Sequence, residues 1–209
     1  MKRVLVVIGL LISIIAISYI SSNKLSILIN LGEISDKPSF IYSTACKLLY
    51  RISDDEIKNF IIGRFKNDSD FKLINSYIKI AGVIGIKDAS ADMIKLYVKI
   101  QDDSKYKNTI YYLVSSMGLN GDRSFEPILK TLLEKYNSHN LQIPQYIIAR
   151  SLYLLTGDSY LFHSENGATD TVYVTSKLRS MREIIKDSSN RSRTYEEKMA
   201  LNDLFNKPE

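Results

Sequence analysis

Four turns recur at nearly constant spacing along this chain, and each places an aspartate between two apolar segments. Asp54, Asp88 and Asp122 are 34 residues apart, and Asp158 follows 36 residues later. Apolar residues recur at the same 34-residue offset on both sides of the turns: Leu49, Val83 and Met117 before them, and Phe60, Ile94 and Ile128 after them. A fixed period of this length is typical of repeat proteins, whose units bury their apolar faces against one another. The spacing therefore predicts a repeated unit of helix, tight turn and helix.

The segments between these turns have the apolar periodicity of α-helices. Ile57, Phe60, Ile61 and Phe65 fall on one helical face, because residues three or four apart lie above one another. Residues 70–85 and 108–119 are apolar almost all round, which predicts inner helices. We therefore expect an all-α fold.

Local signals at the helix starts support this reading. A turn aspartate can accept hydrogen bonds from the free N–H groups of the helix that follows, so Asp122 is predicted to be a helix cap rather than a ligand. Ser53 with Glu56, and Thr194 with Glu197, have the spacing of a capping box.

Three stretches carry a resemblance to a known family. The segments "VIGIKDASADMIKLYVK", "GLNGDRSFEPILKTLLEK" and "SLYLLTGDSYLF" resemble short bacterial HEAT repeats, and the similarity covers residues 40–160. It implies an α-solenoid of about four helix pairs, a fold used mainly as a binding scaffold, and it brings no catalytic residue. Tetratricopeptide repeats share the 34-residue period and are the second reading, although their small-residue pattern is not visible.

The N-terminus predicts the compartment. Lys2 and Arg3 precede residues 4–20, which are apolar apart from two serines and one tyrosine. A basic start followed by an apolar stretch is typical of an export signal, cleaved or retained as a membrane anchor, and a buried core helix is the remaining alternative. We expect residues 1–23 to be this signal or anchor and 24–39 a linker. The body would then be exported, either periplasmic or held at the inner membrane through residues 4–20.

The C-terminal part, residues 161–209, departs from the repeat. Polar and apolar residues alternate around Asn166-Gly167, which predicts an irregular insertion or a small hairpin. Helices are expected from Ser176 and from Thr194, and together they would cap the open end of the solenoid.

Composition excludes several function classes. The net charge of +5 falls to +3 once Lys2 and Arg3 are set aside, which is too small to indicate nucleic-acid binding. The single cysteine, Cys46, excludes an internal disulfide and is expected to be buried. Two histidines without clustered ligand spacing predict no metal site, and no phosphate or dinucleotide motif predicts a cofactor. We expect no enzyme activity; His163, beside Glu165, is the best single catalytic candidate.

Two sets of residues are candidates for partner binding. Tyrosines on the predicted helices bury large area at small entropic cost, although they also suit the contacts between repeats. A basic helix face could meet an acidic partner or lipid headgroups, or could simply be solvated. The candidates are Tyr97, Tyr112, Tyr136, Tyr146, Arg179, Arg182 and Lys186.

The sequence thus predicts a non-catalytic, protein-binding scaffold of the cell envelope. Two alternatives stay open: an inhibitor or immunity-type protein that blocks an envelope enzyme or toxin, and a hydrolase with its site in residues 158–175.

Overall fold

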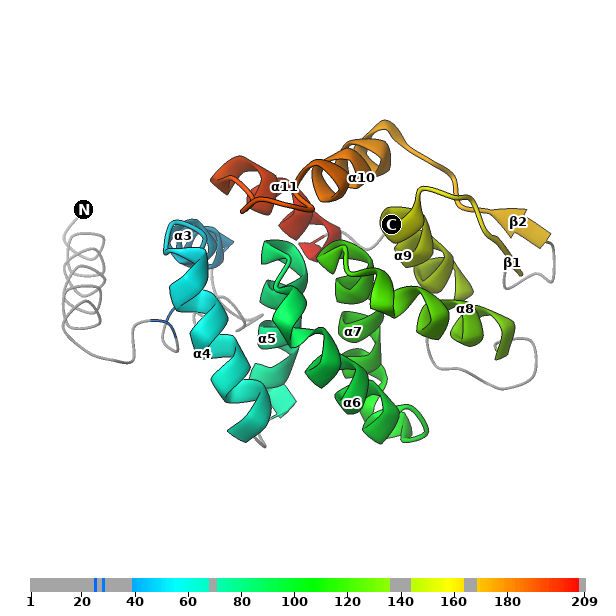
Figure 1. Cartoon of the computed structure of the whole chain (residues 1–209), viewed down its shortest axis with the longest axis horizontal. Coiled ribbons are helices and arrows are strands. Elements are labelled where there is room, and N and C mark those ends of the chain that lie inside the picture. The colour runs from blue at the N-terminus through cyan, green and yellow to red at the C-terminus, as the bar shows by residue number, and fades with distance from the viewer. Residues whose placement is uncertain are drawn as a thin grey trace. The chain divides into compact units, whose positions relative to one another are not determined.

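A computed structural model of the chain (Figure 1) describes residues 25, 28, 39–67, 71–135, 144–163 and 169–206. The fold is mostly helical, as the apolar periodicity predicts. The chain divides into two units, residues 1–53 and residues 54–209, and each is described by itself.

Helix α3 (Ser39–Leu49) belongs to the first unit. The Cys46 side chain is buried, which confirms the expectation for the only cysteine. No helix among the described residues has both the length and the apolar character needed to cross a membrane. Residues 4–20, on which the membrane-segment expectation rests, lie outside the described part of the chain.

Three helix pairs open the second unit at a constant period. The pairs are α4 (Asp54–Asn67) with α5 (Phe71–Ile84), α6 (Ser90–Ile100) with α7 (Lys107–Asn120), and α8 (Glu126–Lys135) with α9 (Gln145–Thr156). The first helices of the pairs begin 36 residues apart, and the second helices end 36 residues apart. Short 3-10 turns, η1 (Lys87–Ala89), η2 (Ser104–Tyr106) and η3 (Arg123–Phe125), lead into α6, α7 and α8.

The structural period corrects the 34-residue register. Gly85, Gly121 and Gly157 directly follow α5, α7 and α9, and all three have a positive φ. This left-handed conformation at a helix C-terminus favours glycine, so the glycines mark the equivalent positions. Asp122 directly follows its glycine, whereas Asp88 lies three residues after Gly85 and inside η1. Asp122 and Asp158 therefore occupy equivalent positions after their glycines, whereas Asp88 does not.

The second helices of the three pairs form one row (Figure 1). Helix α7 packs between α5 and α9, while α4, α6 and α8 each contact the second helix of their own pair. Residues 113–120 of α7 are all buried, which confirms the prediction that this segment is an inner helix. Gly82 faces Ser116 and Gly118 faces Ser151, and a Cβ atom at either glycine would lie 2.7 Å from an atom of the facing serine. Small residues therefore let the inner helices approach closely.

The C-terminal elements turn back along this row. Strand β1 (Leu161–His163) packs on α9 and pairs antiparallel with β2 (Thr169–Thr171), with Phe162 opposite Asp170. Helix α10 (Ser176–Asp187) contacts α9, but α11 (Tyr195–Asn206) contacts α5, at the other end of the row. The expectation that α10 and α11 together cap the open end of a solenoid stays a prediction.

Candidate functional site

The ends of the inner helices create a local electrostatic problem. The last turn of any helix leaves carbonyl groups without intrahelical donors, and its dipole concentrates negative potential there. In this protein the C-terminal ends of α5 and α7 come together beside the loop that joins α10 to α11, residues 188–194. A positive group with several N–H donors can satisfy both ends.

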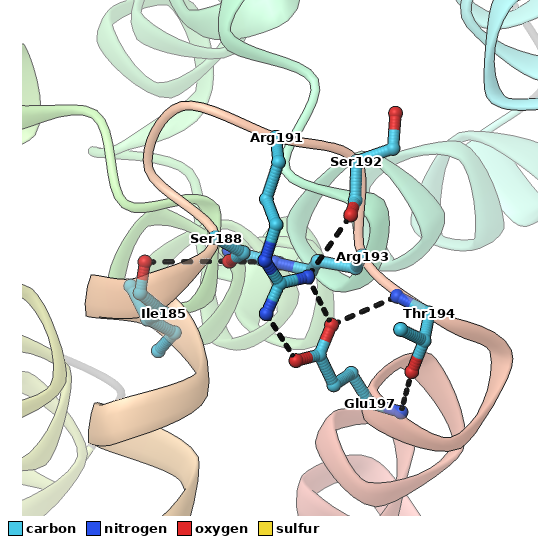
Figure 2. Close-up of polar contacts among 7 residues, drawn as sticks. All are labelled: Ile185, Ser188, Arg191, Ser192, Arg193, Thr194 and Glu197. Atoms are coloured by element: carbon cyan, nitrogen blue, oxygen red, sulfur yellow. Dashed lines mark hydrogen bonds and ion pairs between the residues drawn. The ribbon is translucent and has the colours of Figure 1, made fainter.

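Arg193 provides that group. Its Nη1 donates to the carbonyl oxygens of Gly82 and Val83, at 2.7 and 2.8 Å. Its Nη2 donates to Leu119 O and Asn120 O, at 2.7 and 3.5 Å. The remaining donor, Nε, reaches Ser188 Oγ at 2.9 Å, a contact drawn in Figure 2. All five N–H donors of the guanidinium are used, although the residue is only 5% exposed. Burial lowers the pKa of Arg193 to about 10.

A second arginine serves the third inner helix. Arg182 Nη2 donates to Thr156 O, the last residue of α9, at 3.2 Å. A Cβ atom at Gly157 would lie 3.3 Å from Arg182 Nε, so the glycine also makes room for this side chain. Arg182 therefore takes part in the packing of α10 on α9, and its assignment to a partner-binding face stays a prediction.

The start of α11 holds the Arg193 loop in place (Figure 2). Thr194 N donates to Glu197 Oε2 at 2.8 Å, and Glu197 N donates to Thr194 Oγ1 at 3.2 Å. This reciprocal pair confirms the predicted capping box. The Glu197 carboxylate also accepts two hydrogen bonds from Arg191, at 2.6 and 2.8 Å. The Arg191 guanidinium is the main reason why the pKa of Glu197 falls to about 2.

A polar cleft of about 370 Å³ opens beside Arg193. Its walls come from the start of α4, the turns after α5 and α7, Ile185 and residues 188–193. Several charged groups in the walls already have partners: Lys58 pairs with Asp88, and Lys87 Nζ donates to Ser189 O at 2.8 Å. Asp54 pairs with Lys198 of α11. The cleft can admit a small polar molecule or a polar side chain. The ion pairs and the hydrogen bond just described, however, give its charged residues a structural role.

Asp122 is a helix cap, as predicted. Its Oδ1 accepts from Ser124 N at 2.9 Å, at the start of η3. Burial raises the pKa of this carboxyl group, but its hydrogen bonds outweigh burial and the net shift is downward. Asp88 has no such role, because Ile86 occupies the cap position of η1.

The candidate tyrosines that the structure describes, Tyr97, Tyr112 and Tyr146, lie on three different helices, α6, α7 and α9. Tyr97 is buried, and burial, with the Asp102 charge, raises its pKa to about 12. It lines a groove of about 320 Å³ between α6 and α8, together with Val98, which is 59% exposed. Tyr112 stacks on Phe205 of α11, with ring centroids 5.6 Å apart.

Tyr146 makes an edge-to-face contact with Phe162 of β1, with ring centroids 5.8 Å apart and ring planes at 65°. Tyr112 and Tyr146 therefore take part in contacts between elements, while Tyr136 lies outside the described residues. On α10, Arg179 and Lys186 are exposed, and Lys186 lies 3.8 Å from Glu183.

The described residues contain no group of three or more histidine, cysteine, aspartate or glutamate side chains arranged to hold a metal ion. His163 pairs through its backbone with Thr169, whereas its side chain and Glu165 lie outside the described part. The most connected residue of the site, Arg193, carried no specific signal in the sequence, since its four carbonyl partners are 73 to 111 residues away.

Comparisons with known proteins found no matching family model, no matching curated protein and no matching solved structure.

Proposed function

We propose that this protein is a non-catalytic scaffold of the cell envelope that binds another protein through a short HEAT-like α-solenoid. One observation carries the proposal: three consecutive helix pairs repeat at 36 residues, with a left-handed glycine ending each inner helix. Stacked helix pairs of this kind present extended surfaces, and such surfaces serve binding in repeat proteins.

The location in the envelope rests on the N-terminal segment. Lys2 and Arg3 followed by the apolar residues 4–20 favour export of the body, with the segment either cleaved or retained as an anchor. A C-terminal fusion to a reporter that is active only outside the cytoplasm tests this placement. An active fusion is expected, and an inactive but stable fusion would contradict export. Mass spectrometry of the mature N-terminus distinguishes cleavage from anchoring.

Site-directed photo-crosslinking in cells tests the binding function. A photoreactive amino acid is placed singly at exposed positions of different elements: Val98 on α6, Arg179 on α10 and Glu196 on α11. We expect a discrete adduct with one protein at positions of one face and none at the others. Met93, which is fully buried, is the matched control that should yield only intramolecular products.

The crosslinking result also distinguishes the scaffold hypothesis from the inhibitor hypothesis. Absence of adducts from every exposed position, in cells that contain the folded protein, would refute the scaffold. The captured protein could prove to be an enzyme. If an equimolar amount of this protein lowers the activity of that enzyme, the inhibitor hypothesis replaces the general scaffold.

A further inference from the structure

A groove in the outer layer of the repeats is lined mainly by apolar side chains. Helix α6 packs on α7 and α8 packs on α9, and a groove of about 320 Å³ lies between the two outer helices. Three large apolar side chains are exposed among the described residues, and the one on a helix, Val98, lines this groove at 59% exposure. An apolar groove that contains an exposed apolar residue indicates an interaction surface.

The dimensions of the groove suit a helix. Its α8 wall runs from Pro127 to Lys135, a rise of roughly 12 Å or about two helical turns. An amphipathic helix with apolar side chains at i, i+4 and i+7 spans a similar length, roughly 10 Å. Both walls are α-helices, whose N–H and C=O groups bond within each helix, so the groove offers no strand edge to an extended peptide.

The polar groups of the groove limit the chemistry of its occupant. Lys135 is the one charged residue among the described residues that line the groove, and it is exposed. Tyr97 also lines the groove, and its hydroxyl has no hydrogen-bond partner among the described residues. Burial and the Asp102 charge raise the pKa of Tyr97 to about 12, so the hydroxyl keeps its proton and can donate. The lysine therefore favours an acidic residue of the occupant, and the hydroxyl favours a neutral acceptor because Asp102 is already near it.

We propose that this groove docks an amphipathic α-helix of the partner protein, with its apolar face against Val98 and Ile128 and an acidic residue beside Lys135. This docking site rests on the proposed scaffold function, because it is the surface through which that scaffold would bind. Val98, Pro127, Thr131 and Lys135 are all exposed, so a small molecule in the groove would stay largely in solvent. A helix covers the whole length of the groove and satisfies its own backbone groups.

A display library of helical peptides tests the chemistry of the groove without knowledge of the natural partner. The peptides are about 16 residues long, so that an isolated helix can form, and one helical face is randomised. They are selected on the full-length protein purified in detergent and counter-selected on its Val98→Asp variant. We expect the retained peptides to carry large apolar residues at i, i+4 and i+7 and an acidic residue, and to bind with a dissociation constant on the order of 10 µM. Failure to retain any peptide, or retention of basic or extended peptides instead, would overturn the proposal.

Two variants on the α8 wall test whether the retained peptides lie in the groove. Fluorescence anisotropy should show binding weakened by about tenfold in Thr131→Arg, because a long charged side chain would fill the groove, and by about threefold in Lys135→Gln. Thr171→Arg, which changes an exposed threonine of β2, is the matched control and should bind within about twofold of wild type. Unchanged binding in Thr131→Arg or in Lys135→Gln would overturn the proposal.

Photo-crosslinking in cells separates this docking site from the scaffold function. A photoreactive amino acid at Thr131 should give the same adduct as one at Val98, and mass spectrometry should map the crosslinked segment to an amphipathic helix with an acidic residue. Adducts from Arg179 or Glu196, but none from Thr131 and Val98, would overturn the docking site and leave the scaffold standing. An adduct with a second copy of this chain would also overturn the docking site. Absence of adducts from every position would refute the scaffold and the docking site together.

Discussion

Arg193 stabilises two helix ends that are far apart in the sequence. Its guanidinium replaces the water that the C-terminal carbonyls of α5 and α7 would otherwise bind, and it places a positive charge at both dipole ends. Since burial lowers the pKa of this group only to about 10, the guanidinium stays charged at neutral pH.

Replacement of Arg193 by methionine should destabilise the protein. The side-chain volume is roughly kept, but four carbonyl groups lose a buried donor, so we expect a loss of about 3 kcal/mol in the free energy of unfolding. Urea denaturation measures the change. Arg179→Met is the matched control and should stay within about 0.5 kcal/mol of wild type. A loss below about 1 kcal/mol for Arg193→Met would contradict the structural role.

Glu197 should make stability depend on acid pH. Its pKa is about 2 in the folded protein, against an ordinary 4.5, so folding favours the carboxylate. This contribution is complete above the ordinary pKa and is lost as the pH falls through the folded value. The stability difference between wild type and Glu197→Gln should therefore be constant at neutral pH and shrink between about pH 4.5 and 2. A difference that stays constant down to pH 2 would show that Glu197 is not held as a carboxylate.

At the scale of the elements, close approach of the inner helices depends on their glycines. Gly82 and Gly118 lie inside α5 and α7, where glycine lowers helix propensity by about 1 kcal/mol relative to alanine. Contact with Ser116 and Ser151 explains their presence, because a methyl group has no space there. Closer packing of the inner helices thus offsets the lower helix propensity of the two glycines.

Gly118→Ala should destabilise the protein despite its better helix propensity. The new Cβ would lie 2.7 Å from the Ser151 Cα atom, and overpacking of this kind costs about 1–3 kcal/mol. Gly63→Ala is the matched control within α4, since a Cβ there meets nothing within 4 Å. It should stabilise the protein by up to about 1 kcal/mol. Thermal unfolding of both variants gives the comparison, and equal shifts in the same direction would refute the packing argument.

At the scale of the second unit, the return of α11 to α5 ties the last helix to the first inner helix. Phe205 stacks on Tyr112 and lies under Lys79, with the ammonium 5.6 Å from its ring centroid. Together with Arg193, these contacts join α5, α7 and α11 across more than 70 residues of sequence. Contacts between residues far apart in the sequence therefore hold α11 against the inner helices α5 and α7.

Native-state hydrogen exchange should detect this linkage. Because α11 shares buried contacts with α5 and α7, its most protected amides should open with the same free energy as those of the two inner helices. In Arg193→Met, protection of α11 should fall before that of α7. An α11 that exchanges independently in the wild-type protein would mean that it is only a peripheral addition.

Sequence by itself determined the local structure. Apolar periodicity predicted the helical class and the buried segment of α7, and spacing within four residues predicted the Thr194–Glu197 capping box. The recurrence of turn aspartates predicted the Asp122 cap. The residues that form these features are close together in the chain, so the local sequence indicates that they interact. The register was less secure, because three of the four turn aspartates indicated a period of 34 residues, while the backbone conformation of the glycines established a period of 36.

Only the tertiary structure decided which distant groups meet. Arg193 and Gly82 are 111 residues apart, and nothing near either residue specifies the other. The same holds for Lys198 with Asp54, and for Arg150, whose burial depends on where α10 and α11 lie. Such contacts follow from the packing of several helices at once. A basic residue that looks solvated in the sequence can therefore be buried, like Arg193, or half-buried, like Arg182.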